Sequence, residues 1–148
     1  MRCALAVERR IHRCLTMHPQ AHTPSAVLEL FVRFVHGAQL EAAVSLYETT
    51  AAMVEKPGRV ARGEHEIRDA LRSLIESGVQ LSIDVTRVVQ ASDIAFVGSA
   101  WSVSRMADGS RTELARGQGT DVMRRQGDGT WRFVIDNPYG AALGESRP

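Results

Sequence analysis

The sequence predicts an α+β fold in which helices come first and long antiparallel strands come last. Between Pro24 and Gly78, apolar residues recur mainly at helical spacing, interrupted by one extended segment. From Val79 onward, apolar and polar residues alternate with a period of two. Three turn pairs divide this second half into four strands: Ser92-Asp93, Asp108-Gly109 and Asp128-Gly129.

Each predicted element has one apolar face to bury. We therefore expect a cone-shaped, curved antiparallel sheet wrapped around three N-terminal helices. The mouth of such a cone lies between the sheet and the helices and suits a small-molecule pocket. The outer face of the sheet must also be covered, and we expect a second copy of the chain to cover it, giving a homodimer through the sheet face.

The helices have recognisable ends. Thr23 can cap the first helix and Pro24 suits its first position, and Gly37 ends it. The second helix is expected over Gln39–Tyr47. The third begins at Gly63, with acidic residues in its first turn, and stops at Gly78. The expected strands are Thr49–Glu55, a short edge strand Arg59–Arg62, Val79–Gln90, Ile94–Met106, Thr112–Arg125 and Trp131–Asn137.

Composition indicates one ordinary globular domain: 148 residues, 44% hydrophobic and 24% charged. A formal net charge of +1 gives no reason to expect nucleic acid as a partner. No apolar run of about 18 residues occurs, so no membrane span is expected and a cytoplasmic location is the default. Lys56 is the only lysine, and this arginine bias is typical of a GC-rich bacterial genome.

We divide the chain into a basic, frayed N-terminal extension (residues 1–22), the domain (23–142) and a short tail (143–148). Cys3 and Cys14 both fall in the extension, and their spacing fits neither a disulfide framework nor a zinc site. No metal-ligand pattern, phosphate loop or dinucleotide motif is present, so we predict no metal and no cofactor.

Two carboxylates stand out because acids are rare in strands: Asp121 and Asp136. If the odd positions of the strand 112–125 line a pocket, Gly117 and Gly119 leave room for a ligand and Asp121 points at it. An apolar pocket would raise the pKa of that carboxyl and make it a proton or hydrogen-bond donor. The alternative is a solvated strand carboxylate or an ion pair with Arg116 or Arg132.

The position of Asp136 is open at this stage. Alternation from Ile135 to Asn137 places its side chain on the outer face, where it would pair with an arginine, and the alternative is a general base in the pocket. Asn137 and Tyr139 then share the inner face, as ligand contacts or as packing. Tyr47 and Trp101 are amphipathic aromatics near the expected cavity or plain core residues. Glu55 is either a second candidate base or a rim salt bridge with Lys56.

Three segments carry a resemblance: LEAAVSLYETTAAMVEKPG, RGEHEIRDAL and DGTWRFVIDNPYG. Together with the element order they resemble the nuclear transport factor 2-like superfamily, and within it the SnoaL-like and ketosteroid-isomerase-like bacterial proteins, over roughly residues 24–142. The resemblance implies a cystatin-like cone. It also implies a broad range of activities, since the superfamily includes isomerases, polyketide cyclases, epoxide hydrolases, dehydratases and members without a known reaction.

Residue by residue, the resemblance argues against steroid isomerase activity. Where those enzymes have a catalytic Asp before a proline, this chain has Lys56, preceded by Glu55. Phe31 stands at the position of their oxyanion-hole Tyr. Their second oxyanion-hole acid matches Asp121. Other members often carry an Asp at the position of Thr49-Thr50, and it is absent here. The pocket positions of their last strand match Ile135, Asn137 and Tyr139.

The sequence thus predicts cofactor-free acid–base chemistry on a small, mostly apolar organic molecule, of the isomerase, cyclase or hydratase/hydrolase type. The acid is Asp121, and the base is Asp136 or Glu55. Ligand binding without chemistry, or an association module that recruits partners through the sheet, are the alternatives. The expected substrate contacts are Tyr47, Trp101, Asn137, Tyr139, Phe31, Met53 and Met123.

Overall fold

The computed structural model describes residues 18–140, so the predicted tail and most of the predicted extension lie outside the described residues. Three helices precede most of the strands, as expected. They are α1 (Pro24–His36), α2 (Leu40–Val44) and α3 (Gly63–Glu76). The strands are β1 (Tyr47–Lys56), β2 (Arg59–Arg62), β3 (Gln80–Ala91), β4 (Ile94–Ala107), β5 (Ser110–Arg125) and β6 (Trp131–Asp136).

The ends of α1 confirm the capping prediction. The Thr23 hydroxyl accepts a hydrogen bond from the Ala26 N–H at 3.2 Å, and Pro24 occupies the first turn. The second helix was predicted too long, because α2 ends at Val44 and Tyr47 already belongs to β1. The Phe133 N–H donates to the Leu46 carbonyl at 2.8 Å, so sheet pairing takes over from the helix at this point.

One mixed sheet contains all six strands in the order β2-β1-β6-β5-β4-β3. The expected antiparallel ladder is present except at one place: β1 and β6 run parallel. No hairpin joins these two strands, since about half of the chain separates them. No local turn therefore requires them to pair antiparallel. The α+β cone is confirmed, with a mixed sheet.

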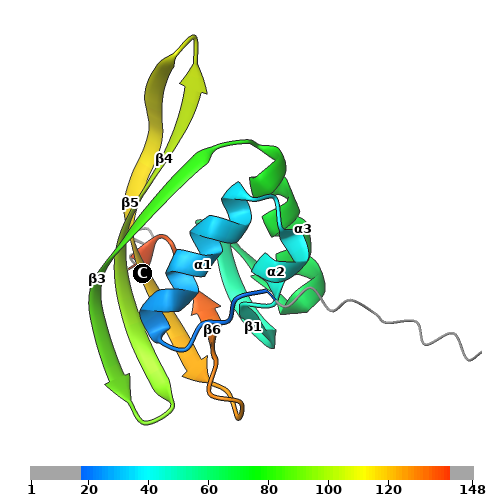
Figure 1. Ribbon diagram of the computed structural model, residues 1–148, viewed down its shortest axis with the longest axis vertical. Helices are drawn as coiled ribbons and strands as arrows, with labels where there is room; N and C mark the ends of the chain where they lie inside the picture. The colour runs from blue at the N-terminus through cyan, green and yellow to red at the C-terminus, as the bar shows by residue number, and fades with distance from the viewer. Residues whose placement is uncertain (1–17, 141–148) are drawn as a thin grey trace, which may run out of the picture.

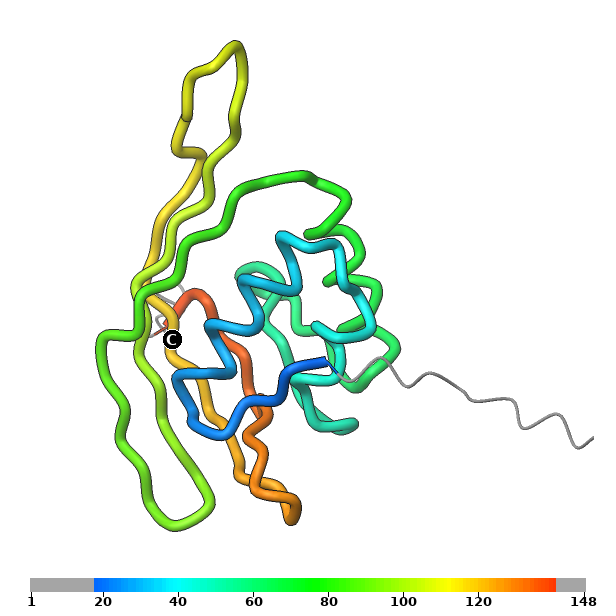
Figure 2. Tube along the Cα trace, in the orientation of Figure 1, coloured from blue at the N-terminus to red at the C-terminus, as the bar shows by residue number. Residues whose placement is uncertain are grey.

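Figure 1 shows the sheet curving past the helices, with α1 and α3 both on its concave side. The β4–β5 hairpin extends beyond the rest of the molecule, and its tip projects clear of the helices (Figure 2). None of the described helices is long and apolar enough to cross a membrane.

The core lies between α1 and the parallel strand pair. The rings of Tyr47 and Phe133 stack with centroids 4.7 Å apart, and Phe31 of α1 meets Phe133 edge-on at 6.0 Å. From α3, Ile67 and Leu71 are fully buried. This core fills one end of the cone and leaves a cavity next to it.

Candidate functional site

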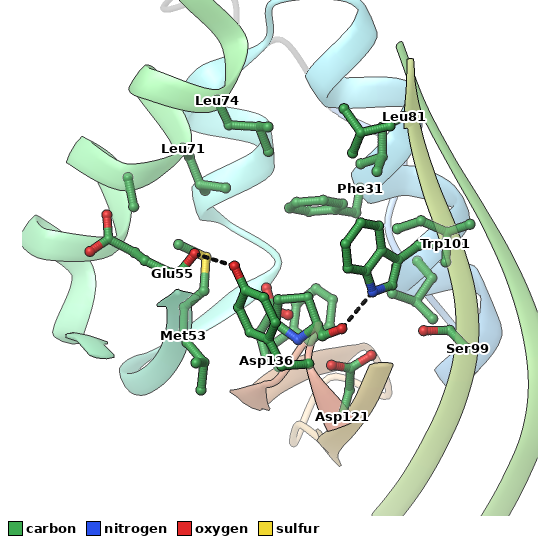
Figure 3. A pocket seen from close by; sticks show the side chains of 18 residues that line it. Phe31, Met53, Glu55, Leu71, Leu74, Leu81, Ser99, Trp101, Asp121 and Asp136 are labelled. Atoms are coloured by element: carbon green, nitrogen blue, oxygen red, sulfur yellow. Dashed lines mark hydrogen bonds between the residues drawn. The ribbon is translucent and has the colours of Figure 1, made fainter. Parts of the chain in front are cut away.

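The candidate site is a cavity of about 270 Å³ between α1, α3 and the concave face of the sheet. Its wall is mostly apolar, with Asp121 and Asp136 at one end and Glu55 at one side (Figure 3). The lining residues are Leu28, Phe31, Met53, Val54, Glu55, Ala70, Leu71, Leu74, Leu81, Ile83, Ser99, Trp101, Val103, Asp121, Phe133, Asp136, Pro138 and Tyr139.

Asp121 and Asp136 both line this cavity, from the neighbouring strands β5 and β6. Val122 pairs with Ile135 in the antiparallel ladder, so Asp121 lies directly opposite Asp136. Side chains at such paired positions project from the same face, with Cβ atoms about 4.5–5.5 Å apart. The two acids therefore form a cross-strand pair.

The outward placement of Asp136 by simple alternation is wrong, and a β-bulge is the reason. Val122 pairs with Ile135, but the next residue, Met123, pairs with Phe133, which leaves Val134 as an extra residue in β6. Phe133 is buried inside, and after the bulge it is Asp136 that returns to the inner face. Ile135, matched by the resemblance to a pocket position, is 42% exposed on the outside.

Asn137 is displaced by the same bulge. Its side-chain nitrogen donates to the Gly140 carbonyl at 3.2 Å, and its side-chain oxygen accepts from the Tyr139 N–H at 3.3 Å. These contacts organise the turn after β6, and the Asn137 side chain does not line the cavity. Its backbone N–H instead donates to Asp121 Oδ1 at 2.9 Å.

Each carboxyl of the pair has a protein donor. Tyr47 is buried behind Asp136 and donates its hydroxyl to Asp136 Oδ2 at 2.5 Å. Asp121, only 2% exposed, accepts the Asn137 N–H. Within residues 18–140, neither arginine of the alternative interpretation pairs with Asp121, and Arg116 instead pairs with Glu113 at 2.6 Å on the exposed part of β5.

Electrostatics keep one proton on the pair near neutral pH. Burial, and then the negative charge of Asp136, raise the pKa of Asp121 to about 8, although the N–H of Asn137 opposes the rise. Burial raises the pKa of Asp136 to about 6, opposed by the hydrogen bonds from Tyr47 and Asp121. Because the two carboxyls lie opposite each other and share one cavity, they titrate as a coupled pair. Asp121 is the member that retains the proton.

Two hydrogen bonds fix the segment after β6 against the cavity. The Trp101 indole N–H donates to the Pro138 carbonyl at 2.5 Å. The Tyr139 hydroxyl donates to the Glu55 carbonyl at 3.0 Å, and both bonds are dashed in Figure 3. The carboxylate of Glu55 pairs with Arg59 at 2.5 Å, which makes it a rim salt bridge, although with a different partner from the expected Lys56.

The glycines of β5 leave room for protein side chains. They do lie on the inner face with Asp121, as predicted. However, a Cβ at Gly117 would come within 2.6 Å of the Trp101 ring, and one at Gly119 within 2.7 Å of the Ser99 hydroxyl. The space that the sequence suggested for a ligand is thus occupied by Trp101 and Ser99.

Of the other predicted contacts, Phe31, Met53, Trp101 and Tyr139 line the cavity. Met123 is fully buried and belongs to the core, and Tyr47 acts through Asp136. Ser99 and the apolar wall were not named as site residues. The alternating pattern of β3 and β4 could have indicated them, because it places these wall residues on one face with Trp101: Leu81, Ile83, Ser99 and Val103.

Chemically, the arrangement offers a proton donor and a proton acceptor side by side in an apolar cavity. Such a pair can protonate an oxygen and remove a neighbouring proton at the same pH. Within residues 18–140, no cluster of three His, Cys, Asp or Glu side chains could hold a metal ion.

The fold and the paired acids define a class of protein: α+β cones that enclose a small acidic-ended cavity. The chain has the NTF2-like, cystatin-like fold, with ketosteroid-isomerase-like structural neighbours. No protein-family model and no curated protein sequence matches it. The proteins to which this chain is similar are therefore found among solved structures.

An NTF2-like protein with a cystatin-like fold from Novosphingobium aromaticivorans is 16% identical, with a TM-score of 0.70 over 81% of this chain and 80% of that one. A ketosteroid isomerase-like protein from Erwinia carotovora atroseptica is 25% identical, with a TM-score of 0.61 over 76% of this chain and 88% of that one.

Two further structural neighbours are named for an association domain and for a bound ligand. A structure from Thiobacillus denitrificans, named for a calcium/calmodulin-dependent protein kinase type II association domain, is 18% identical, with a TM-score of 0.69 over 81% of this chain and 96% of that one. A structure from Catenulispora acidiphila in complex with S-DNPA is 16% identical, with a TM-score of 0.65 over 76% and 86% of the two chains. At these identities the likeness establishes the fold.

Proposed function

We propose that this protein catalyses a proton transfer on a small, mostly apolar organic molecule, without a cofactor, as an isomerase, cyclase or hydratase would. The single observation that carries the proposal is the Asp121–Asp136 pair at one end of an otherwise apolar cavity. Carboxyl groups are rarely buried without a cation partner, and here two of them face the same space.

The two acids have different roles. Asp121 holds the proton and donates a hydrogen bond to a substrate oxygen. Asp136, ionised near neutral pH and held in place by the Tyr47 hydroxyl, removes a proton from the adjacent carbon or hydroxyl group. Return of that proton at another position completes an isomerisation with no net gain or loss. A placed acid–base pair of this kind contributes about 10²–10⁴-fold in rate.

Asp136 is a better base than Glu55 on geometric grounds. Asp136 lies directly across from the acid and is half-buried, whereas Glu55 is at the rim and is neutralised by Arg59. Replacing Glu55 by Gln therefore separates the two assignments, because Asp136→Asn should slow the reaction and Glu55→Gln should not.

Deuterium exchange tests the proposal without a known substrate. Cyclic ketones such as α-tetralone are incubated with the protein in D₂O, and NMR follows solvent deuterium entering the carbon next to the carbonyl. We expect catalysed exchange that Asp121→Asn and Asp136→Asn each lower at least about tenfold. Asp84→Asn, at an exposed position on β3, is the matched control. Equal exchange rates in all variants would contradict the proposal.

Ligand binding without chemistry is the second candidate. One observation favours it: both carboxyls are already hydrogen-bonded within the protein, Asp136 to Tyr47 and Asp121 to Asn137. The same experiment separates the two functions, because a binding protein would retain the ketone and show no exchange.

We also propose a homodimer through the outer sheet face. Four apolar residues pair in a row across β3, β4, β5 and β6: Val89, Phe96, Val122 and Ile135. Phe96 is 43% exposed and Val89 56%, so the row forms an exposed apolar patch on the outer face. A second copy would bury the row, and the association-domain neighbour of this fold supports such a use.

A further inference from the structure

The volume of the cavity limits the size of the ligand. An apolar cavity of about 150 Å³ holds benzene, which corresponds to about 25 Å³ for each non-hydrogen atom. The 270 Å³ of this cavity therefore accommodates about eleven non-hydrogen atoms, the size of two fused rings. A four-ring steroid has about twice as many, so this space would enclose only about half of it.

The charges around the cavity limit the charge of the ligand. Within residues 18–140, the lining includes Glu55, Asp121 and Asp136 but no Lys, Arg or His. An anionic ligand would lose its hydration beside a carboxylate with no cation to compensate, which is strongly unfavourable.

A cationic ligand is not needed either. The Tyr47 hydroxyl and the Asn137 N–H each donate to one carboxyl, and no buried side-chain nitrogen or oxygen in the described part of the chain lacks a partner. Both carboxyls therefore have hydrogen-bond donors within the protein, and the site does not require an ammonium group as a further donor.

The acid pair lies at one end of the cavity. In Figure 3, Asp121 and Asp136 lie at the lower end, while Leu71, Leu74 and Leu81 lie at the opposite end. A ligand that satisfies both ends has one oxygen group beside the acids and a hydrocarbon body against the leucines.

We propose that the substrate is an uncharged mono- or bicyclic compound of about eleven non-hydrogen atoms, with one carbonyl or hydroxyl oxygen directed at Asp121 and Asp136. The inference rests on the proposed function only in naming the occupant a substrate, since its size, charge and orientation follow from the cavity.

Calorimetric binding to the full-length protein tests the inference with four probes at neutral pH. The probes are α-tetralone, which is neutral, aminotetralin, which is cationic, tetralin carboxylate, which is anionic, and progesterone, which has four rings. We expect α-tetralone to bind at least about tenfold more tightly than each of the others. Tighter binding of aminotetralin, of the carboxylate or of progesterone would overturn the charge or size assignment.

A variant pair tests the location. Leu74 is a partly buried wall residue, so Leu74→Trp fills the cavity and should weaken α-tetralone binding at least about tenfold. Leu114→Trp, on the exposed part of β5, is the control and should leave binding unchanged. Unchanged binding in Leu74→Trp, with folding verified by circular dichroism, would refute the site.

These outcomes remain separable from those of the exchange experiment. Binding of α-tetralone without catalysed exchange would contradict the proposed catalysis and would support the proposed ligand class. Catalysed exchange together with tighter binding of progesterone would support the proposed catalysis and would contradict the proposed ligand size.

Discussion

Replacing Asp121 by Asn should change the pH dependence of stability. In the folded protein the pKa of Asp121 is raised from its ordinary value of 3.8 to about 8, first by burial and then by Asp136. Folding therefore takes up a proton at any pH between these two values. The stabilisation is complete below about pH 4 and is lost as the pH rises through the folded-state value.

The magnitude follows from proton linkage. One proton bound only in the folded state lowers the free energy of unfolding by about 1.4 kcal/mol for each pH unit of increase. Above about pH 6, Asp136 is largely ionised in the folded state, so Asp121 is the member of the pair that still binds a proton there. From about pH 6 to 7.5, the wild type should lose about 2 kcal/mol that the Asp121→Asn variant does not lose.

Denaturant titrations followed by tryptophan fluorescence measure this difference, since the chain has two tryptophans and Trp131 is buried. Comparing variant with wild type removes the contribution of groups that titrate alike in both. Asp84→Asn removes an exposed carboxyl and should run parallel to the wild type. Parallel curves for Asp121→Asn and the wild type would show that Asp121 is ionised in the folded protein, and the acid role would fall.

Three further outcomes are expected. Tyr47→Phe removes the hydrogen-bond donor to Asp136, so the pKa of Asp136 should rise further. In denaturant titrations the free energy of unfolding should fall by about 1–3 kcal/mol at pH 8 and by less at pH 5, where Asp136 is largely protonated. Gly117→Ala places a Cβ against Trp101 and should cost about 1–3 kcal/mol in denaturant titrations, whereas Gly127→Ala, in open space, should be nearly neutral. Phe96→Glu should convert the proposed dimer to a monomer in light scattering, and a monomeric wild type would refute the dimer.

Most of the fold could be predicted from the sequence because its local signals agree with the final structure. The Thr23-Pro24 cap, the glycine stops and the Asp-Gly turns placed the ends of most elements within two residues. The parallel pairing of β1 with β6 could not be predicted in this way, because it joins segments far apart in the chain and no turn encodes it.

The site was only partly predictable for a related reason. Asp121 was placed correctly, because β5 alternates regularly from Gly117 to Met123. The extra residue in β6 shifts the alternation by one position, which brings Asp136 into the cavity and moves Asn137 and Ile135 out of it. Val134 carries no feature that marks it as a bulge, since valine is an ordinary strand residue.

The bulge also explains how a strand can serve both the core and the site. Regular alternation after Phe133 would keep Ile135 and Asn137 on the inner face and would direct Asp136 at solvent. With one residue inserted, β6 buries Phe133 against Tyr47 and, three residues later, presents Asp136 to the Tyr47 hydroxyl. Tyr47 therefore contacts β6 twice, by ring stacking and by a hydrogen bond, and the second contact exists only because of the shift. The position of the proposed catalytic pair thus depends on a backbone irregularity rather than on the residue types alone, as is common for bulges near functional sites.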